Sequence, residues 1–174
     1  MSYNERAKTL LRSYKELGES ELAKTMAQTM VNLLGCFEQQ PTILVPMPSN
    51  RGSISERGFN PAELIARELS LRIPGLRWSN ILLRTRETKD QSKLSPAERR
   101  QNQQGSMIAK VGTGRLLLVD DVVTTGSSLL TAKETLESAG YSVTGFVTFA
   151  ETEAKGCTLT TQALLPADGG TSWN

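Results

Sequence analysis

The sequence predicts an α/β fold with a mostly parallel central sheet flanked by helices. Three observations carry this prediction. Short apolar runs of strand type alternate with amphipathic helical stretches along the chain. Arg115–Val119 is continuously apolar after its first residue, as are strands that a parallel sheet buries on both faces. Repeated strand, loop and helix units join parallel strands through right-handed crossovers, and 174 residues suit a single domain spanning 1–174.

The N-terminal segment, residues 1–35, predicts a helical hairpin. Apolar side chains recur at helical spacing over Ala7–Leu17, and again over Ala23–Leu34. Gly18 and Gly35 follow these two repeats directly, at the position where glycine commonly ends a helix. The pattern therefore indicates two consecutive helices before the first strand.

A strand, a polar loop and a helix follow the hairpin. Ile43–Pro46 is a short apolar run of strand type, and residues 48–58 are predicted to form a loop. Asn60 is a residue type preferred at a helix N-cap, Pro61 suits the first helical position, and Glu63 completes a pattern that resembles a capping box. Together these elements are half of a βαβ unit.

The remaining elements complete an α/β core that we assign to residues 36–150. Ile81–Leu83 is a second candidate strand, residues 129–139 predict a helix, and Val143–Phe149 alternates well enough for a further strand. Residues 151–174 form a C-terminal tail that these patterns leave unassigned.

A long polar segment interrupts the core, and we predict that residues 85–107 form a flexible loop. The segment is charged and rich in Gln and Asn. Some twenty polar residues inside a compact domain are typical of a functional lid or a disordered segment. From Arg84 to Arg100, six Lys and Arg residues face three acids, a local surplus of positive charge that would suit closure over a polyanion.

The composition excludes several classes of active site. The chain contains no histidine, which removes Ser/His/Asp and Cys/His nucleophile systems, His-ligated zinc and HExxH hydrolases. Cys36 and Cys157 are far apart and form no CxxC pair, so neither a zinc knuckle nor a dithiol redox site is expected.

The charge and hydropathy patterns limit the partners. A net charge of +2 is too small for a global field that attracts nucleic acid, so any anion site must be local and direct DNA binding is not expected. No stretch approaches the roughly 18 continuous apolar residues that span a bilayer, so no membrane partner is expected and the predicted location is cytoplasmic.

The segment from Leu116 to Ser128 carries the chemistry. A predicted buried strand ends at Asp120 and Asp121, and the carboxyl ends of strands are where open α/β sheets bind ligands. A loop of hydroxyl residues and glycine follows, suited to hold a phosphate at the next helix N-terminus. Its residues are Thr124, Thr125, Gly126, Ser127 and Ser128. Two carboxylates that accept from sugar hydroxyls, beside a phosphate loop, indicate a ribose phosphate ligand.

Other interpretations of this segment fit less well. One alternative is purely structural: the two aspartates end a strand and the hydroxyl residues form a solvated turn. It would explain each of these features singly, but not their combination in one segment. A response-regulator receiver domain also gathers aspartates at strand ends, but leaves the hydroxyl loop unexplained. A P-loop is absent, and Gly112 and Gly114 cannot complete GxGxxG because Leu117 occupies the third glycine position.

The segment Leu116–Ser128 resembles the 13-residue signature of type I phosphoribosyltransferases, with Ser128 where threonine is commoner. Val45–Pro48 and Arg57–Leu64 resemble the first strand, pyrophosphate loop and helix of the ComF/GntX group in that family. Arg84–Gln91 and Glu98–Asn102 are similar to the long flexible loop of the same group. Many ComF proteins carry an N-terminal zinc ribbon, which we expect to be absent here.

The resemblance implies a type I phosphoribosyltransferase fold with residues 1–35 as a helical hood. It also implies a function, in which phosphoribosyl pyrophosphate binds with Mg²⁺, the phosphoribosyl group passes to a nitrogenous acceptor, and pyrophosphate is released. The Mg²⁺ would be carried by the pyrophosphate, without a direct protein ligand. The acceptor base is not readable from the hood, and a homodimer is expected from the wider family.

The resemblance assigns roles to individual residues. Asp120 and Asp121 become the catalytic carboxylates, and the loop from Thr124 to Ser128 becomes the 5-phosphate site. The implied pyrophosphate loop contains Ser49, Asn50 and Arg51, and the implied flexible-loop contacts are Gln91, Arg99 and Arg100. Arg51 and Arg57 can also be interpreted as ordinary loop charges. The alternative function is a non-catalytic protein that senses phosphoribosyl pyrophosphate or a nucleotide, or acts in DNA uptake through partners.

Overall fold

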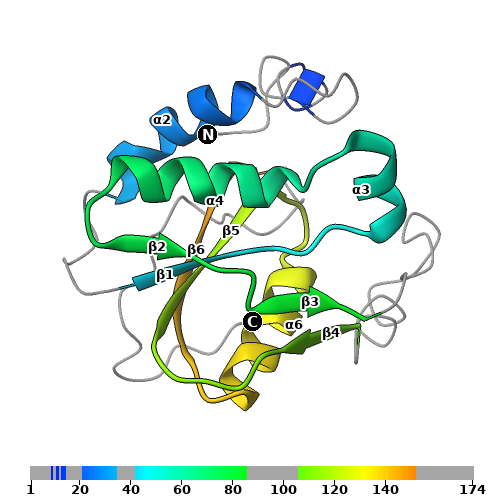
Figure 1. Cartoon of the computed structure of the whole chain (residues 1–174), viewed down its shortest axis with the longest axis vertical. Helices are drawn as coiled ribbons and strands as arrows, with labels where there is room; N and C mark the ends of the chain where they lie inside the picture. The colour runs from blue at the N-terminus through cyan, green and yellow to red at the C-terminus, as the bar shows by residue number, and fades with distance from the viewer. Residues whose placement is uncertain are drawn as a thin grey trace.

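The computed structural model describes residues 9, 11, 13, 14, 21–34, 42–85 and 106–151. Its centre is a four-stranded sheet with the order β2-β1-β5-β6, in which every neighbouring pair is parallel (Figure 1). The strands are β1 (Thr42–Pro46), β2 (Leu76–Trp78), β5 (Arg115–Val123) and β6 (Ser142–Glu151). The parallel sheet predicted from the apolar runs is therefore confirmed. Among the described residues, no helix is both long and apolar enough to cross a membrane.

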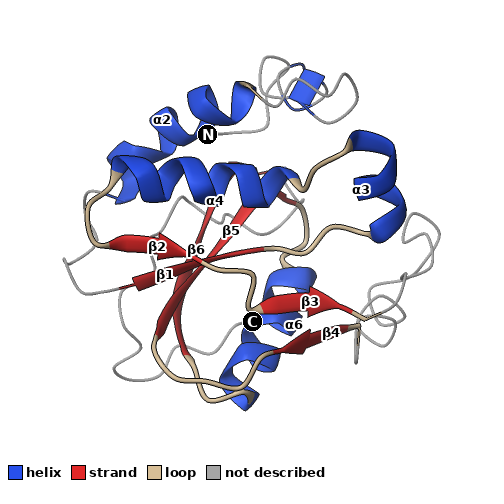
Figure 2. Ribbon diagram, viewed as in Figure 1, coloured by secondary structure: helices blue, strands red, loops and turns tan. Residues whose placement is uncertain are grey.

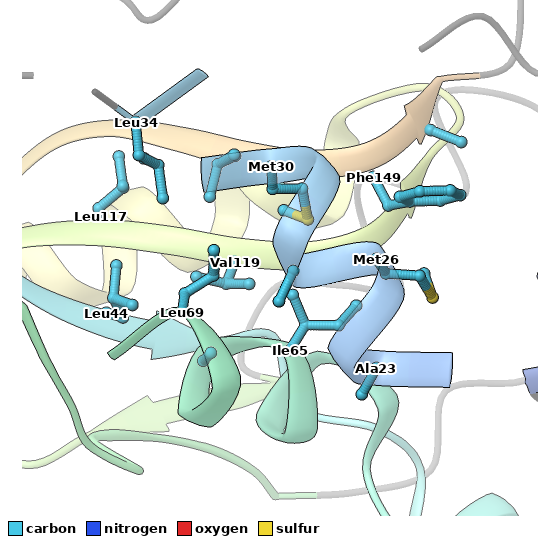
Figure 3. Packing of buried hydrophobic residues seen from close by; sticks show 14 of the residues in the cluster. Ala23, Met26, Met30, Leu34, Leu44, Ile65, Leu69, Leu117, Val119 and Phe149 are labelled. Atoms are coloured by element: carbon cyan, nitrogen blue, oxygen red, sulfur yellow. The ribbon is translucent and has the colours of Figure 1, made fainter. Parts of the chain in front are cut away.

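Two helices cover one face of this sheet, as Figure 2 shows. They are α2 (Leu22–Leu34), which matches the second repeat of the predicted hairpin, and α4 (Pro61–Arg72). Side chains from both helices meet over β1, β5 and β6 in one buried cluster (Figure 3). Met30, Ile65 and Leu117 are at most 1% exposed within it. Burial of this apolar surface provides the main driving force for packing the helices on the sheet.

The other face of the sheet is covered by a helix and a small ribbon. The helix is α6 (Ser127–Ser138), and the ribbon consists of the antiparallel strands β3 (Leu82–Arg84) and β4 (Met107–Ala109). Their buried side chains form a second apolar cluster with alternate residues of β1 and β5. Along β5, Leu116 and Leu118 belong to this second cluster, and Leu117 and Val119 to the first. Strand β5 is thus buried on both faces, as a central parallel strand should be.

Helix α4 begins where the sequence indicates. The Oδ1 atom of Asn60 accepts a hydrogen bond from the backbone N–H of Ala62 at 3.2 Å, and Pro61 occupies the first helical position. The helix ends at Arg72, and its buried face includes Ile65 and Leu69. The predicted N-cap at Asn60 is therefore confirmed.

The structure corrects the predicted loop over residues 48–58. Arg51–Arg57 is a short helix, α3, which has no buried residue and therefore leaves no apolar pattern in the sequence. Gly58 ends it with φ +83°, in the left-handed region that glycine adopts without a steric cost. The hydrogen bond from Ile54 N–H to the Asn50 carbonyl, at 3.0 Å, closes the first turn.

Several strand boundaries also differ from the prediction. Strand β5 continues through both aspartates to Val123, because β6 pairs with it along this extension. The predicted flexible loop 85–107 extends too far at its C-terminal end, because Met107 is the first residue of β4. Strands β2 and β4 have three residues each and were not predicted. Most of the predicted loop and nearly all of the tail 151–174 lie outside the described residues.

Candidate functional site

The two aspartates lie in the last part of β5. Asp121 is buried and Asp120 half-buried, and the Asp121 N–H donates to Asp120 Oδ1 at 2.9 Å. Because β5 extends past them, they belong to the strand itself and do not begin the following loop. Pairing of Asp120 with Thr148 of β6 fixes the backbone at this point. The strand therefore holds both carboxylates on a rigid element.

The loop after β5 leads directly into the N-terminus of α6. Thr124 and Thr125 are exposed, and Gly126 precedes α6 with φ +71°. The hydroxyls of Thr125 and Ser127 lie 2.9 Å apart in a hydrogen bond. Helix α6 begins at Ser127, so the N–H groups of its first turn and its dipole favour a negative group at this end. The predicted phosphate-loop residues are thus brought together at one helix N-terminus.

The predicted pyrophosphate loop leaves the sheet beside these aspartates. Pro46 pairs with Val119, and the Met47 N–H donates to the Val119 carbonyl at 2.8 Å. Val119 immediately precedes Asp120, so the residues after β1 start next to the first carboxylate. Adjacent parallel strands end at the same edge of a sheet, which places both predicted loops at one edge.

Within that loop, the three predicted residues occupy different environments. The Ser49 hydroxyl donates to Asn60 Oδ1 at 2.9 Å, and Arg51 is exposed at the first position of α3. Asn50 is the N-cap residue of α3 but makes no side-chain cap bond. Its Oδ1 is buried and accepts no hydrogen bond from the part of the chain that the structure describes. A buried amide oxygen in this state lacks the hydrogen bond that normally offsets its removal from water.

Arg84 is a site residue that the sequence analysis did not single out. It ends β3, and its Nε donates to the Pro48 carbonyl at 3.3 Å. Burial lowers the pKa of Arg84, and attraction to the Asp120 carboxylate acts in the opposite direction. Arg84 therefore places a half-buried positive charge near both Asp120 and the predicted pyrophosphate loop. The sequence offered one signal for Arg84, which is its position at the start of the polar, positively charged segment.

Tyr14 connects the N-terminal helical residues to the same region. It is fully buried, and its hydroxyl donates to the Pro61 carbonyl at 2.7 Å. Its ring lies 5.4 Å from that of Phe59, tilted by 39°. Burial raises the pKa of Tyr14, the nearby Asp121 carboxylate raises it further, and Arg57 opposes this. The N-terminal segment thus reaches the surroundings of the second carboxylate.

The remaining predicted site residues, Gln91, Arg99 and Arg100, lie outside the described residues. The ends of their segment do meet, because the Thr85 N–H donates to the Ser106 carbonyl at 2.9 Å and extends the β3–β4 ribbon. Among the described residues, no three Asp, Glu, Cys or His side chains gather into a group able to hold a metal ion.

Comparison with protein families gives a match over most of the chain. Residues 15–160 match the model of the phosphoribosyl transferase domain. Competence protein F of Haemophilus influenzae is 36% identical over 107 residues, covering 58% of this chain and 46% of that protein. Competence protein ComFC of Streptococcus pneumoniae is 28% identical over 141 residues, covering 80% of this chain and 60% of that protein. The chain thus spans about half the length of these curated relatives.

The solved structures that match the chain are more distant in sequence. A hypoxanthine phosphoribosyltransferase from Staphylococcus aureus has a TM-score of 0.46 and 14% identity, covering 78% of this chain and 68% of that one. An adenine phosphoribosyltransferase from Thermoanaerobacter pseudethanolicus has a TM-score of 0.47 and 13% identity, covering 78% of this chain and 83% of that one.

Proposed function

The chain belongs to the phosphoribosyl transferase domain family, with ComF-type competence proteins among its curated relatives, and from this we propose its reaction. The protein binds phosphoribosyl pyrophosphate with Mg²⁺, transfers the phosphoribosyl group to a nitrogenous acceptor, and releases pyrophosphate.

One observation carries the proposal: three features that such a ligand needs lie at one edge of the sheet. The loop after β1 starts at the hydrogen bond between Met47 and Val119, and the aspartates follow directly in β5. The hydroxyl-rich loop and the N-terminus of α6 come next along the chain. We assign the pyrophosphate to the first feature, the ribose hydroxyls to Asp120 and Asp121, and the 5-phosphate to Thr124–Ser128.

In the proposed reaction, the bond between the anomeric carbon and the pyrophosphate oxygen breaks, and its electron pair leaves with pyrophosphate. The acceptor nitrogen supplies the electron pair for the new bond to carbon. The carboxylates of Asp120 and Asp121 accept hydrogen bonds from the ribose hydroxyls and face the positive charge that develops on the sugar. Arg84 adds positive charge on the pyrophosphate side.

Mg²⁺ would enter with the pyrophosphate, because this ion commonly binds through substrate phosphates with few protein ligands. The ion would therefore be held by the pyrophosphate and water, without a direct protein ligand. The Oδ1 of Asn50, which has no donor among the described residues, would accept a hydrogen bond from such a water molecule once the ligand is bound. When bound, Mg²⁺ supplies charge neutralisation on the leaving group.

The test is thermal unfolding in Mg²⁺ with and without phosphoribosyl pyrophosphate. Ligand at about 100 times its Kd adds roughly 2.7 kcal/mol to stability, or about 5 to 10 °C in Tm for a domain of this size. The double variant Asp120→Asn/Asp121→Asn should lose this shift. The matched control Glu134→Gln/Glu137→Gln removes two charges from α6, away from the sheet edge, and should keep it. An unshifted wild-type protein at millimolar ligand would contradict the proposal.

A second function is favoured by the names of the curated relatives, both of which are competence proteins. In that case the protein senses phosphoribosyl pyrophosphate or a nucleotide, or acts in DNA uptake through partners, without catalysis. Pyrophosphate release discriminates the two. An enzyme releases pyrophosphate with one member of a purine and pyrimidine panel, whereas a sensor binds the ligand and releases none with any base.

The proposal also includes a cytoplasmic homodimer without direct DNA binding. Light scattering coupled to size-exclusion chromatography measures the oligomeric state. Gel retardation of single-stranded DNA over a salt series measures direct DNA binding. Because a net charge of +2 provides few phosphate contacts, we expect no retardation even at low salt.

A further inference from the structure

Asn60 makes more contacts than a helix cap requires. Besides capping α4 through Ala62, its Oδ1 accepts from the Ser49 hydroxyl at 2.9 Å. Its Nδ2 donates to the Met47 carbonyl at 3.0 Å. Both ends of one half-buried amide are therefore engaged with the loop that follows β1.

The orientation of this amide is determined by its partners. The Ala62 N–H can only donate, so it needs the amide oxygen, and the Met47 carbonyl can only accept, so it needs the amide nitrogen. Ser, Thr and Asp also cap helices well, but none provides a donor and an acceptor at this reach. The contacts with the loop, more than the cap, thus require asparagine here.

The contacts hold the loop at two points close to the sheet. The Met47 carbonyl and the Ser49 hydroxyl are both bonded to Asn60, while the Met47 N–H is bonded to Val119 of β5. Between them, these bonds set the direction in which residues 47–50 leave the sheet. Asn50 and Arg51, which we assign to the pyrophosphate, follow immediately.

We propose that Asn60 is a positioning residue that fixes the loop Met47–Asn50 in the conformation that receives pyrophosphate. It acts through Met47 and Ser49 and does not itself contact the ligand. The inference rests on the proposed function for the identity of the ligand, but the conformation of the loop can be tested separately. It also predicts that loss of Asn60 weakens binding of the pyrophosphate and not of the 5-phosphate, because the 5-phosphate loop lies between β5 and α6.

Two substitutions separate the cap from the loop contacts. Asn60→Asp keeps the cap and the acceptor for Ser49, but places an oxygen against the Met47 carbonyl. Asn60→Ser keeps a neutral cap and is too short to reach Met47. Agreement between the two variants excludes an effect of the new charge in Asn60→Asp. Ser79→Ala, at the half-buried residue directly after β2, is the matched control for a lost polar side chain outside this loop.

The first measurement is amide hydrogen exchange. In both Asn60 variants, residues 47–54 should exchange faster than in the wild-type protein, while α4 (61–72) keeps its protection. Loss of one neutral hydrogen bond changes such an equilibrium roughly two- to twelve-fold. Unchanged exchange over residues 47–54 in both variants would overturn the inference, whether or not the protein binds phosphoribosyl pyrophosphate.

The second measurement is calorimetric titration with two probes, inorganic pyrophosphate with Mg²⁺ and ribose 5-phosphate. Asn60→Ser should bind pyrophosphate several-fold more weakly, and ribose 5-phosphate with wild-type affinity. An equal loss for both probes would overturn the positioning role, because it would indicate a general structural defect. A wild-type protein that binds neither probe would contradict the proposed function, and exchange would still decide the role of Asn60 in the loop.

Discussion

At the scale of single residues, Tyr14 links stability to pH. Its buried hydroxyl donates to the Pro61 carbonyl, and burial together with Asp121 raises its pKa above the ordinary value near 10. Between about pH 10 and the raised pKa, the unfolded chain loses the Tyr14 hydroxyl proton and the folded protein keeps it. The free energy of unfolding therefore falls as pH rises, by up to about 1.4 kcal/mol per pH unit from this group.

We expect Tyr14→Phe to isolate this effect, because phenylalanine keeps the ring against Phe59 and has no proton to lose. Near pH 8 the variant should be about 1 kcal/mol less stable than the wild-type protein, owing to the lost hydrogen bond. Between about pH 10 and pH 11.5 that difference should shrink and then reverse. Urea unfolding across this range measures it, and a constant difference would contradict the predicted role of the Tyr14 proton. Other ionisable groups are common to both proteins.

Residues that meet in the site from distant parts of the chain were the hardest to predict. Asp120, Asp121 and the loop to Ser128 are contiguous, so their combined chemistry is visible in the sequence. The contact of Arg84 with Pro48 joins residues 36 positions apart, and that of Tyr14 with Pro61 joins residues 47 apart. Such contacts depend on how the β3–β4 ribbon and Tyr14 pack against the rest of the fold, and a local sequence pattern contains no information about that packing.

At the scale of elements, the loop before α6 depends on one backbone conformation. Gly126 has φ +71°, and a Cβ added there would meet nothing within 4 Å. Gly126→Ala should therefore lower the free energy of unfolding by about 1 to 2 kcal/mol, through the unfavourable backbone conformation alone. Because we assign the 5-phosphate to this loop and to the N–H groups at the start of α6, we expect the variant to bind ribose 5-phosphate more weakly, as measured by calorimetry.

Gly75 provides the matched control. It has φ +86°, and a Cβ added there would also meet nothing within 4 Å, but it lies between α4 and β2. Gly75→Ala should lower the free energy of unfolding by a similar amount and leave ribose 5-phosphate affinity unchanged. If both alanine variants lost affinity equally, destabilisation would account for the effect, and the assignment of the 5-phosphate to this loop would lose its support.

The elements that were predicted differ physically from those that were missed. Ile43–Pro46 and Arg115–Val119 are apolar runs buried at the centre of the sheet, and they pair in register in the structure. Strand β2 has only three residues and forms by pairing with β1, so its own sequence does not predict a strand. Helix α3 buries none of its residues and is stabilised at its ends, by the Asn50 carbonyl and by Gly58.

At the scale of the whole molecule, the two apolar clusters share one strand. Met30 of α2 lies in the cluster on one face and Leu136 of α6 in the cluster on the other, and alternate residues of β5 belong to each. Loosening either face therefore weakens the packing of β5 on both. This arrangement predicts that the described core, including α2, unfolds as one unit.

We expect Met30→Ala and Leu136→Ala each to lower the free energy of unfolding by about 2 to 5 kcal/mol, because both side chains are at most 1% exposed. In each variant, the transitions followed by far-UV circular dichroism and by tryptophan fluorescence should coincide and move together to lower urea. If Met30→Ala shifted only part of the dichroism transition and left the rest at the wild-type midpoint, α2 would be a separate unit. Helix α2 could then move independently of the sheet edge that holds Asp120 and Asp121.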